Sequence, residues 1–194
     1  MRKNNFIPLI LLLAFALSLF AGCRKATTPR PYAYFRIDLP EPAYQPVETD
    51  TILPVSFEMS KYAEISTYRK HEDWINVDYP QWNARIHCSY MHINRDTFAI
   101  VTEESRDLAY KHTMKANAIM ETRYENDTNH VYGILYEITG NAASPAQFYM
   151  TDSCHHFLRG SLYFNNLPNA DSIAPVSEFI LNDMMHLIET LRWK

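Results

Sequence analysis

The densest group of chemically active side chains is the run Asp152-Ser153-Cys154-His155-His156. A serine hydroxyl or a cysteine thiol beside a histidine base could act as the nucleophile of a hydrolase. That chemistry needs the nucleophile and the base within hydrogen-bond reach, but neighbouring residues of a strand point to opposite sides. The chain also has no Gly-x-Ser-x-Gly motif. We therefore interpret the run as a polar hairpin turn, with a hydrolase that uses Ser153 or Cys154 as the alternative.

Eight histidines offer nitrogen ligands for a metal ion. They are scattered, and no two stand at helical i, i+4 spacing with an acid between them, as the common zinc motifs require. A site assembled across strands, for example from His87 and His156, stays open, as does a small-ligand or metal-binding module. The interpretation we favour places the histidines on the surface or in the core, with no metal and no cofactor.

Glycine content and charge exclude two further classes of function. The four glycines are far apart in the chain, whereas phosphate-binding loops need clustered glycines. Lys plus Arg is 18 and Asp plus Glu is 22, a net charge of -4, which makes nucleic acid and anionic head groups poor partners. We expect binding of neither nucleotide nor nucleic acid.

Residues 1–22 have the pattern of an export signal. Two basic residues precede an apolar run that is too short for a membrane-spanning helix. The run ends in the small pair Ala21-Gly22 directly before Cys23, as in a bacterial lipobox, although Phe20 stands where leucine is usual. We predict that Cys23 is acylated with fatty acids such as palmitate. An ordinary signal peptide followed by an incidental cysteine is the alternative.

Acylation at Cys23 would decide where the protein works. Several acyl chains on one residue anchor a protein stably, whereas a single chain binds only marginally. Residues 23–33 are basic and contain prolines, which is typical of a stiff tether. We expect a cell-envelope protein that faces the periplasm and is anchored in either the inner or the outer membrane.

Two other cysteines, Cys88 and Cys154, would lie in an oxidising compartment where a disulfide is permitted. Cys88 shares one side of a predicted strand with Ile86 and Tyr90. A disulfide and a buried free thiol at Cys88 are therefore both open.

Residues 34–194 predict a single domain, because that length is enough for an independent core. Alternating apolar residues and turn signals predict strands over residues 34–39, 55–59, 74–79, 84–93, 120–125, 131–139, 146–152 and 155–165. The last strand has one face that a helix should cover, formed by His156, Leu158, Gly160, Leu162 and Phe164.

Two segments predict helices. One runs over residues 97–118 with Asp96 as its cap, and its apolar stripe is Val101, Leu108, His112, Ala116 and Ile119. The other starts at Pro175, and its stripe is Val176, Phe179, Ile180, Met184, Leu187, Ile188 and Leu191. This order of elements favours the α+β class, with helices packed on an antiparallel sheet.

Several runs of the sequence resemble the gliding motility lipoprotein GldD family of the Bacteroidota. They are residues 136–145, 147–148, 151–153, 156–164, 168–172 and 186–194, and the similarity extends upstream through residues 34–36, 57–58 and 108–110 to the lipobox. The resemblance implies a membrane lipoprotein needed for gliding motility and linked to type IX secretion, and it brings no catalytic residues. The strand over residues 156–164 with the closing helix also looks like the PsbP/Mog1-type α/β/α sandwich.

These inferences predict a non-enzymatic accessory protein that binds other gliding or secretion proteins of the envelope. The expected contacts are loops on a rigid sheet, the usual place for function. The candidate residues are Gly140, Asn141, Ser144, Asp152 and His156 in the segments 140–145 and 152–156, together with Arg159. Arg159 could bind a partner carboxylate through its planar guanidinium, or it could close an internal ion pair. The segment 140–145 could equally be only a long hairpin connection.

Overall fold

The computed structural model describes residues 36–48, 53–67, 73–166 and 169–194. The chain divides into two units, Met1–Tyr34 and Phe35–Lys194. The predicted signal segment, Cys23 and the tether lie outside the described residues. The strands are β1 (Tyr44–Glu48), β2 (Val55–Ser60), β3 (Glu64–Thr67), β4 (Trp74–Tyr79), β5 (Ala84–His92), β6 (Ala116–Asn126), β7 (Val131–Gly140), β8 (Ala146–Thr151), β9 (His156–Phe164) and β10 (Arg192–Trp193). The helices are α2 (Arg95–Tyr110) and α3 (Ala170–Thr190), with short 3-10 helices at Pro80–Trp82 and Lys111–Met114.

The strands form two antiparallel sheets. Seven strands make the larger one in the order β3-β4-β5-β9-β8-β7-β6, and β1, β2 and β10 make the smaller one. The run from β6 to β9 is the predicted meander, and β5 then pairs with β9 along its whole length. The fold is α+β, as the order of elements predicts.

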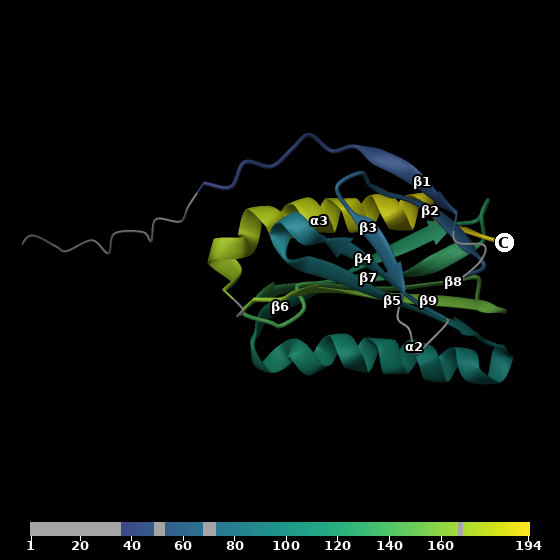
Figure 1. Ribbon diagram of the computed structural model, residues 1–194. Helices are drawn as coiled ribbons and strands as arrows, with labels where there is room; N and C mark the ends of the chain where they lie inside the picture. The colour runs from purple at the N-terminus through teal and green to yellow at the C-terminus, as the bar shows by residue number, and fades with distance from the viewer. Residues whose placement is uncertain (1–35, 49–52, 68–72, 167–168) are drawn as a thin grey trace, which may run out of the picture. The chain divides into compact units, whose positions relative to one another are not determined.

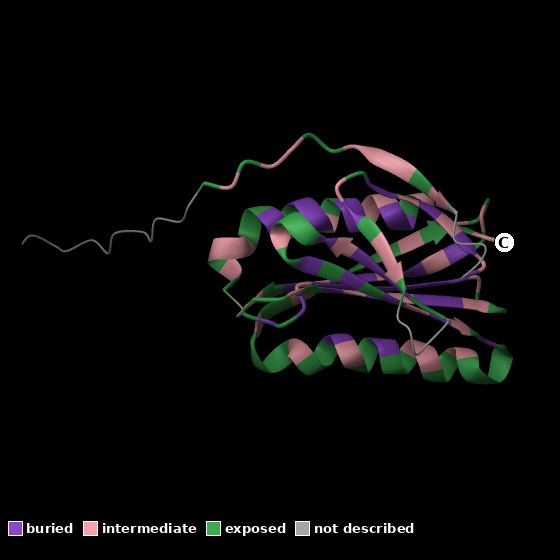
Figure 2. Cartoon of the chain, in the orientation of Figure 1, coloured by how far each residue is buried: buried purple, intermediate pink, exposed green. Residues whose placement is uncertain are grey.

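The larger sheet lies between the two helices, with α3 on one face and α2 on the other (Figure 1). The main core fills the space between α3, β2 and the sheet, with Ile180, Met184 and Leu187 of the helix fully buried. A smaller cluster under α2 contains Tyr149 and Phe157. The outward side of α2 is exposed along its length (Figure 2). Each helix therefore buries one stripe, and the apolar stripe predicted for α3 is confirmed.

Alternation predicted most strands correctly. The segments 55–59, 74–79, 84–93, 131–139 and 146–152 correspond to β2, β4, β5, β7 and β8 within one or two residues. The predicted sides of β5 and β9 are also confirmed, because Ile86, Cys88, Leu158 and Leu162 are buried in the main core.

The prediction of a strand over residues 34–39 is wrong for the part that the structure describes. Residues 36–39 are not in a strand, and the first strand is β1. Ile37 and Leu39 nevertheless pack against the main core. Their alternation therefore reflects packing against the core without strand pairing.

The helix predicted over residues 97–118 is shorter in the structure, and its N-cap is not Asp96. Asn94 is the N-cap, and its side-chain oxygen accepts hydrogen bonds from the backbone N–H groups of Asp96 and Thr97, each at 3.0 Å. The helix ends at Tyr110, and β6 begins at Ala116 because this segment pairs with β7. Tertiary pairing has overridden a local pattern that is compatible with a helix.

The last helix begins earlier than predicted. Asn169 caps α3 at Ala170, so Pro175 lies inside the helix and not at its first position. Proline has no N–H to donate to the preceding turn, which bends a helix. The first turns of α3 are accordingly set at an angle to the rest (Figure 1).

Candidate functional site

The polar turn over residues 152–156 is held together by one carboxylate. Asp152 Oδ1 accepts hydrogen bonds from the backbone N–H groups of Cys154 at 2.9 Å, His155 at 2.7 Å and His156 at 2.8 Å. Ser153 has a φ of 67°, in the left-handed region that tight turns use. Burial by itself would raise the pKa of Asp152, but these three backbone donors and the nearby His156 bring the pKa below its ordinary value.

This turn does not assemble a nucleophile and a base. His156 Nδ1 is bound to the Tyr90 hydroxyl at 2.8 Å, and its ring stacks on Trp193 with centroids 5.2 Å apart. Neither the Ser153 hydroxyl nor the Cys154 thiol has a hydrogen bond to an imidazole within the described part of the chain. The turn predicted from the sequence is confirmed as a turn between β8 and β9.

His87 and His156, which the sequence left open as metal ligands, are not brought together. In the pairing of β5 with β9, His87 lies opposite Ser161, whereas His156 lies opposite His92. The rings of His92 and His155 have centroids 6.0 Å apart. No group of three metal-ligating side chains converges among the residues that the structure describes.

The two cysteines for which a disulfide was left open are free thiols in the structure. Cys88 is buried in the main core, and Cys154 is exposed in the turn before β9. The possible disulfide is therefore not formed, and the buried free thiol is the alternative that the structure contains. Burial raises the pKa of the Cys88 thiol to about 12, which keeps it protonated and unreactive.

The segment 140–145 packs on the start of α3. Asn141 Oδ1 accepts a hydrogen bond from the backbone N–H of Ala170 at 2.9 Å, and Ser144 is fully buried with its hydroxyl donating to the carbonyl of Ala146 at 3.1 Å. Gly140 has a φ of 100°, which favours glycine. These residues have structural roles, and their contact with a partner stays a prediction.

Arg159 lies in a different environment, on the face of the larger sheet opposite α3. Helix α2 packs on part of this face, over residues of β7, β8 and the ends of β5 and β9. The register across β4, β5 and β9 places Trp74 beside Ser89 and Arg159, Asn76 beside His87 and Ser161, and Asp78 beside Arg85 and Tyr163. We call these nine residues, together with Ser66 of β3 beside Asn76, the open face.

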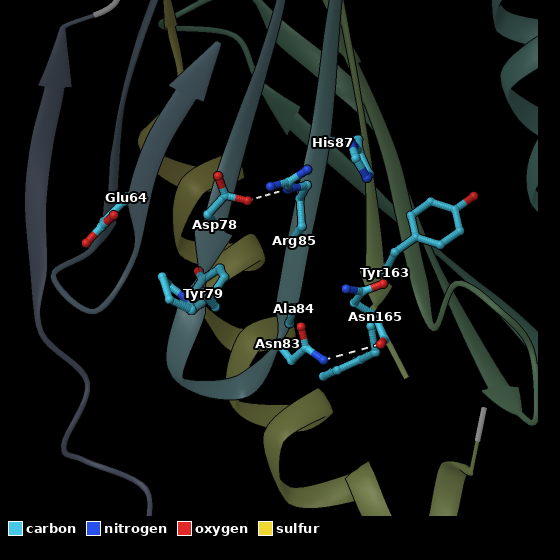
Figure 3. A pocket seen from close by; sticks show the side chains of 11 residues that line it. Glu64, Asp78, Tyr79, Asn83, Ala84, Arg85, His87, Tyr163 and Asn165 are labelled. Atoms are coloured by element: carbon cyan, nitrogen blue, oxygen red, sulfur yellow. Dashed lines mark hydrogen bonds and ion pairs between the residues drawn. The ribbon is translucent and has the colours of Figure 1, made fainter. Parts of the chain in front are cut away.

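Hydrogen bonds order one side of the open face. Arg85 forms an ion pair with Asp78 (Figure 3). The Ser66 hydroxyl donates to Asp78 Oδ2 at 2.5 Å, and Asn76 Nδ2 donates to Ser66 Oγ at 3.3 Å. Asp78 therefore neutralises Arg85, and the chain of donors fixes the orientation of the Asn76 amide.

This orientation fixes the tautomer of His87. Asn76 directs its Oδ1 at His87 Nδ1, 2.8 Å away, so Nδ1 carries the proton and donates it. Burial and then Arg85 lower the pKa of His87, with Asp78 opposing them. The ring is therefore neutral at pH 7, and its Nε2 atom is a hydrogen-bond acceptor.

Two adjoining hollows lie on the open face. The one around Arg159 has a volume of about 270 Å³, and its lining includes Trp74, His87, Ser89, Ser161 and Tyr163. The other has a volume of about 590 Å³ and reaches from His87 and Tyr163 to Glu64 on β3. Figure 3 shows His87 and Arg85 on one strand, with Tyr163 on its neighbour. Trp74 and Tyr163 are 40% and 36% exposed, although both are large aromatic residues.

Arg159 has no hydrogen bond or ion pair within the described ranges, so the internal ion pair considered from the sequence is not formed there. Arg159 was a contact candidate from the sequence, whereas His87 was considered only as a metal ligand and Trp74 and Tyr163 were not named as contact residues. Two signals pointed to them. The alternation of β5 placed His87 on the polar side, and Tyr163 shares the side of β9 that carries Arg159.

The described helices include none that is long and apolar enough to cross a membrane. The fold and the open face thus define an α+β protein with a polar, aromatic-walled surface on its sheet. The family model of the gliding motility lipoprotein GldD matches residues 24–193. The chain therefore belongs to the gliding motility lipoprotein GldD family, and this membership supports association with a membrane at the cell envelope. No curated protein matches the chain.

Proposed function

We propose that this chain is a lipid-anchored accessory component of the gliding motility and type IX secretion apparatus. Cys23 carries the acyl chains, residues 23–33 form the tether, and the folded unit faces the periplasm. The protein acts without catalysis, by contacting other envelope proteins. Membership of the GldD lipoprotein family supports the motility role and the anchor.

The observation that carries the contact role is the open face with Arg159, which has no ion-pair partner among the described residues. A sheet face that carries exposed tryptophan and tyrosine beside an arginine has the residue types that dominate protein–protein binding energy. Asn141, Ser144 and Asp152 direct their polar atoms into the fold instead. Arg159 is therefore the strongest of the predicted contact residues.

Exchange of the acylated residue tests this function. In cells that carry Cys23→Ala, we expect loss of the membrane anchor and a defect in gliding, or in type IX secretion where the host does not glide. Intact-mass measurement of the wild-type protein should show the added acyl chains, and the variant should lack them. Full motility and secretion with the variant, at equal protein level, would contradict the proposal.

A further inference from the structure

We propose that the hollow around Arg159 receives an aspartate or glutamate side chain of a partner protein. This inference rests on the proposed contact role and names the chemistry of the contact. Arg159 binds the carboxylate, and the exposed rings of Trp74 and Tyr163 bind the apolar neighbours of that acid.

Charge is the first argument. The hollow is lined by one arginine, two serines and neutral residues, and no carboxylate lies in it. In the adjoining hollow Asp78 is already paired with Arg85 and bonded to Ser66. The other carboxylate there, Glu64, lies on the edge strand β3, three strands away from β9, which carries Arg159. The positive charge of Arg159 is therefore uncompensated among the described residues. A planar guanidinium matches a carboxylate through two parallel hydrogen bonds, and the Ser89 and Ser161 hydroxyls are further donors nearby.

Size is the second argument. A volume of about 270 Å³ lies below the range of small-molecule sites, which begins at about 300 Å³, and suits a single side chain. The hollow is open toward the larger one through His87 and Tyr163. A segment of a partner can therefore place one side chain at Arg159 and continue across β5 and β4.

His87 adds a directional contact. Its Nε2 atom is an acceptor, because Nδ1 donates to Asn76 Oδ1. An acceptor beside a cation suits a peptide segment, which offers backbone N–H donors next to its acidic side chain. A bare anion would leave this acceptor unused.

A titration with capped peptides tests the inference on the full-length protein in detergent micelles. The probe is an acetylated and amidated pentapeptide with a central glutamate between two leucines, and its control has glutamine instead of glutamate. Binding is followed through the Trp74 indole N–H resonance, which is assigned with Trp74→Phe. We expect saturable binding of the glutamate peptide and binding of the glutamine peptide that is weaker by about tenfold or more.

Three variants complete the design. Arg159→Gln should lower the affinity for the glutamate peptide by about tenfold or more. Arg159→Lys should lower this affinity less, because lysine keeps the positive charge but lacks the planar guanidinium. Arg123→Gln is the matched control, since Arg123 is an exposed strand arginine on β6, and it should bind as the wild type does. Equal binding of the glutamate peptide by the wild type and Arg159→Gln overturns the inference.

A second arm distinguishes a carboxylate from other anions. Inorganic phosphate, acetate and vesicles that contain anionic phospholipid are each titrated as competitors of the glutamate peptide under the same conditions. Weaker displacement of the glutamate peptide by phosphate than by acetate supports the inference, and a reversed order overturns it in favour of a phosphate site. Vesicle binding that depends on Arg159 and competes with the peptide overturns it in favour of a lipid surface.

Failure of this inference can be distinguished from failure of the proposed function. If peptide binding fails while Cys23→Ala abolishes motility or secretion, only the carboxylate contact is wrong. If the peptide binds as expected while Cys23→Ala leaves motility and secretion intact, the contact stands and the anchored role fails.

Discussion

Asp183 is a residue of α3 whose carboxyl group faces the core, with 2% of the residue's surface exposed. The Tyr79 hydroxyl donates to its Oδ2 atom at 3.2 Å, while Oδ1 has no hydrogen-bond partner among the described residues. Burial raises the pKa of Asp183 above its ordinary value of 3.8, and the surrounding hydroxyls offset only part of this effect. The same carboxyl also raises the pKa of Tyr79, after burial of that ring.

Asp183→Asn should change how stability depends on pH. The folded wild type holds the proton of Asp183 more tightly than the unfolded chain, so its stability falls as pH rises from about 4 through the folded pKa and then levels off. Asparagine has no such titration. We expect the variant to gain stability relative to the wild type between pH 4 and pH 7 in urea unfolding, and a difference that does not change with pH would contradict this.

Gly160 is a second position where one residue decides the packing. A Cβ added there would lie 2.2 Å from the Phe148 ring, because β8 and β9 place the two residues opposite each other on the core side. Gly160→Ala should therefore lower the free energy of unfolding by about 1–3 kcal/mol or more. Chemical denaturation measures this loss. The double variant Gly160→Ala/Phe148→Leu should lose less free energy of unfolding than the sum of the losses in the two single variants. Strictly additive losses would argue against the clash.

At the scale of elements, the sequence predicted which faces are buried better than it predicted where the helices begin and end. The apolar stripe of α3 and the alternation of β5 were predictable, because burial of one face imposes a period on the sequence. The end of α2 was not, because its boundary depends on the pairing of β6 with β7. The cap was also misplaced, since Asn94 and Asp96 are both good capping residues and only the backbone geometry decides between them.

Asn94→Ala should destabilise the protein more than Asp96→Ala. The Asn94 side chain satisfies two backbone N–H groups at the start of α2, so its loss should cost about 1 kcal/mol. Asp96 lies in the first turn and interacts only with the helix dipole, which is worth less. Thermal unfolding of both variants measures the difference. If Asp96→Ala lowered the stability as much as Asn94→Ala or more, the assignment of Asn94 as the N-cap would be wrong.

At the scale of the whole molecule, the sheet order brings the candidate site together. Trp74 and His87 come from the consecutive strands β4 and β5, whereas Arg159 comes from β9, much later in the chain. The register of β4, β5 and β9 places the three residues on one face. Arg159 was predictable as a contact residue from its strand face. That Trp74 and His87 lie beside it was not predictable, because the pairing of β5 with β9 is long-range and a single sequence does not reveal it.

Capture of partners from intact membranes tests the central claim most directly. The wild-type lipoprotein, Arg159→Gln and Arg123→Gln are purified from membranes at equal levels, and gliding or type IX secretion is measured in the same cells. The account predicts that the wild type and Arg123→Gln retain the same envelope partner and full function, whereas Arg159→Gln remains anchored but loses both. Retention of that partner and of full function by Arg159→Gln would contradict the account.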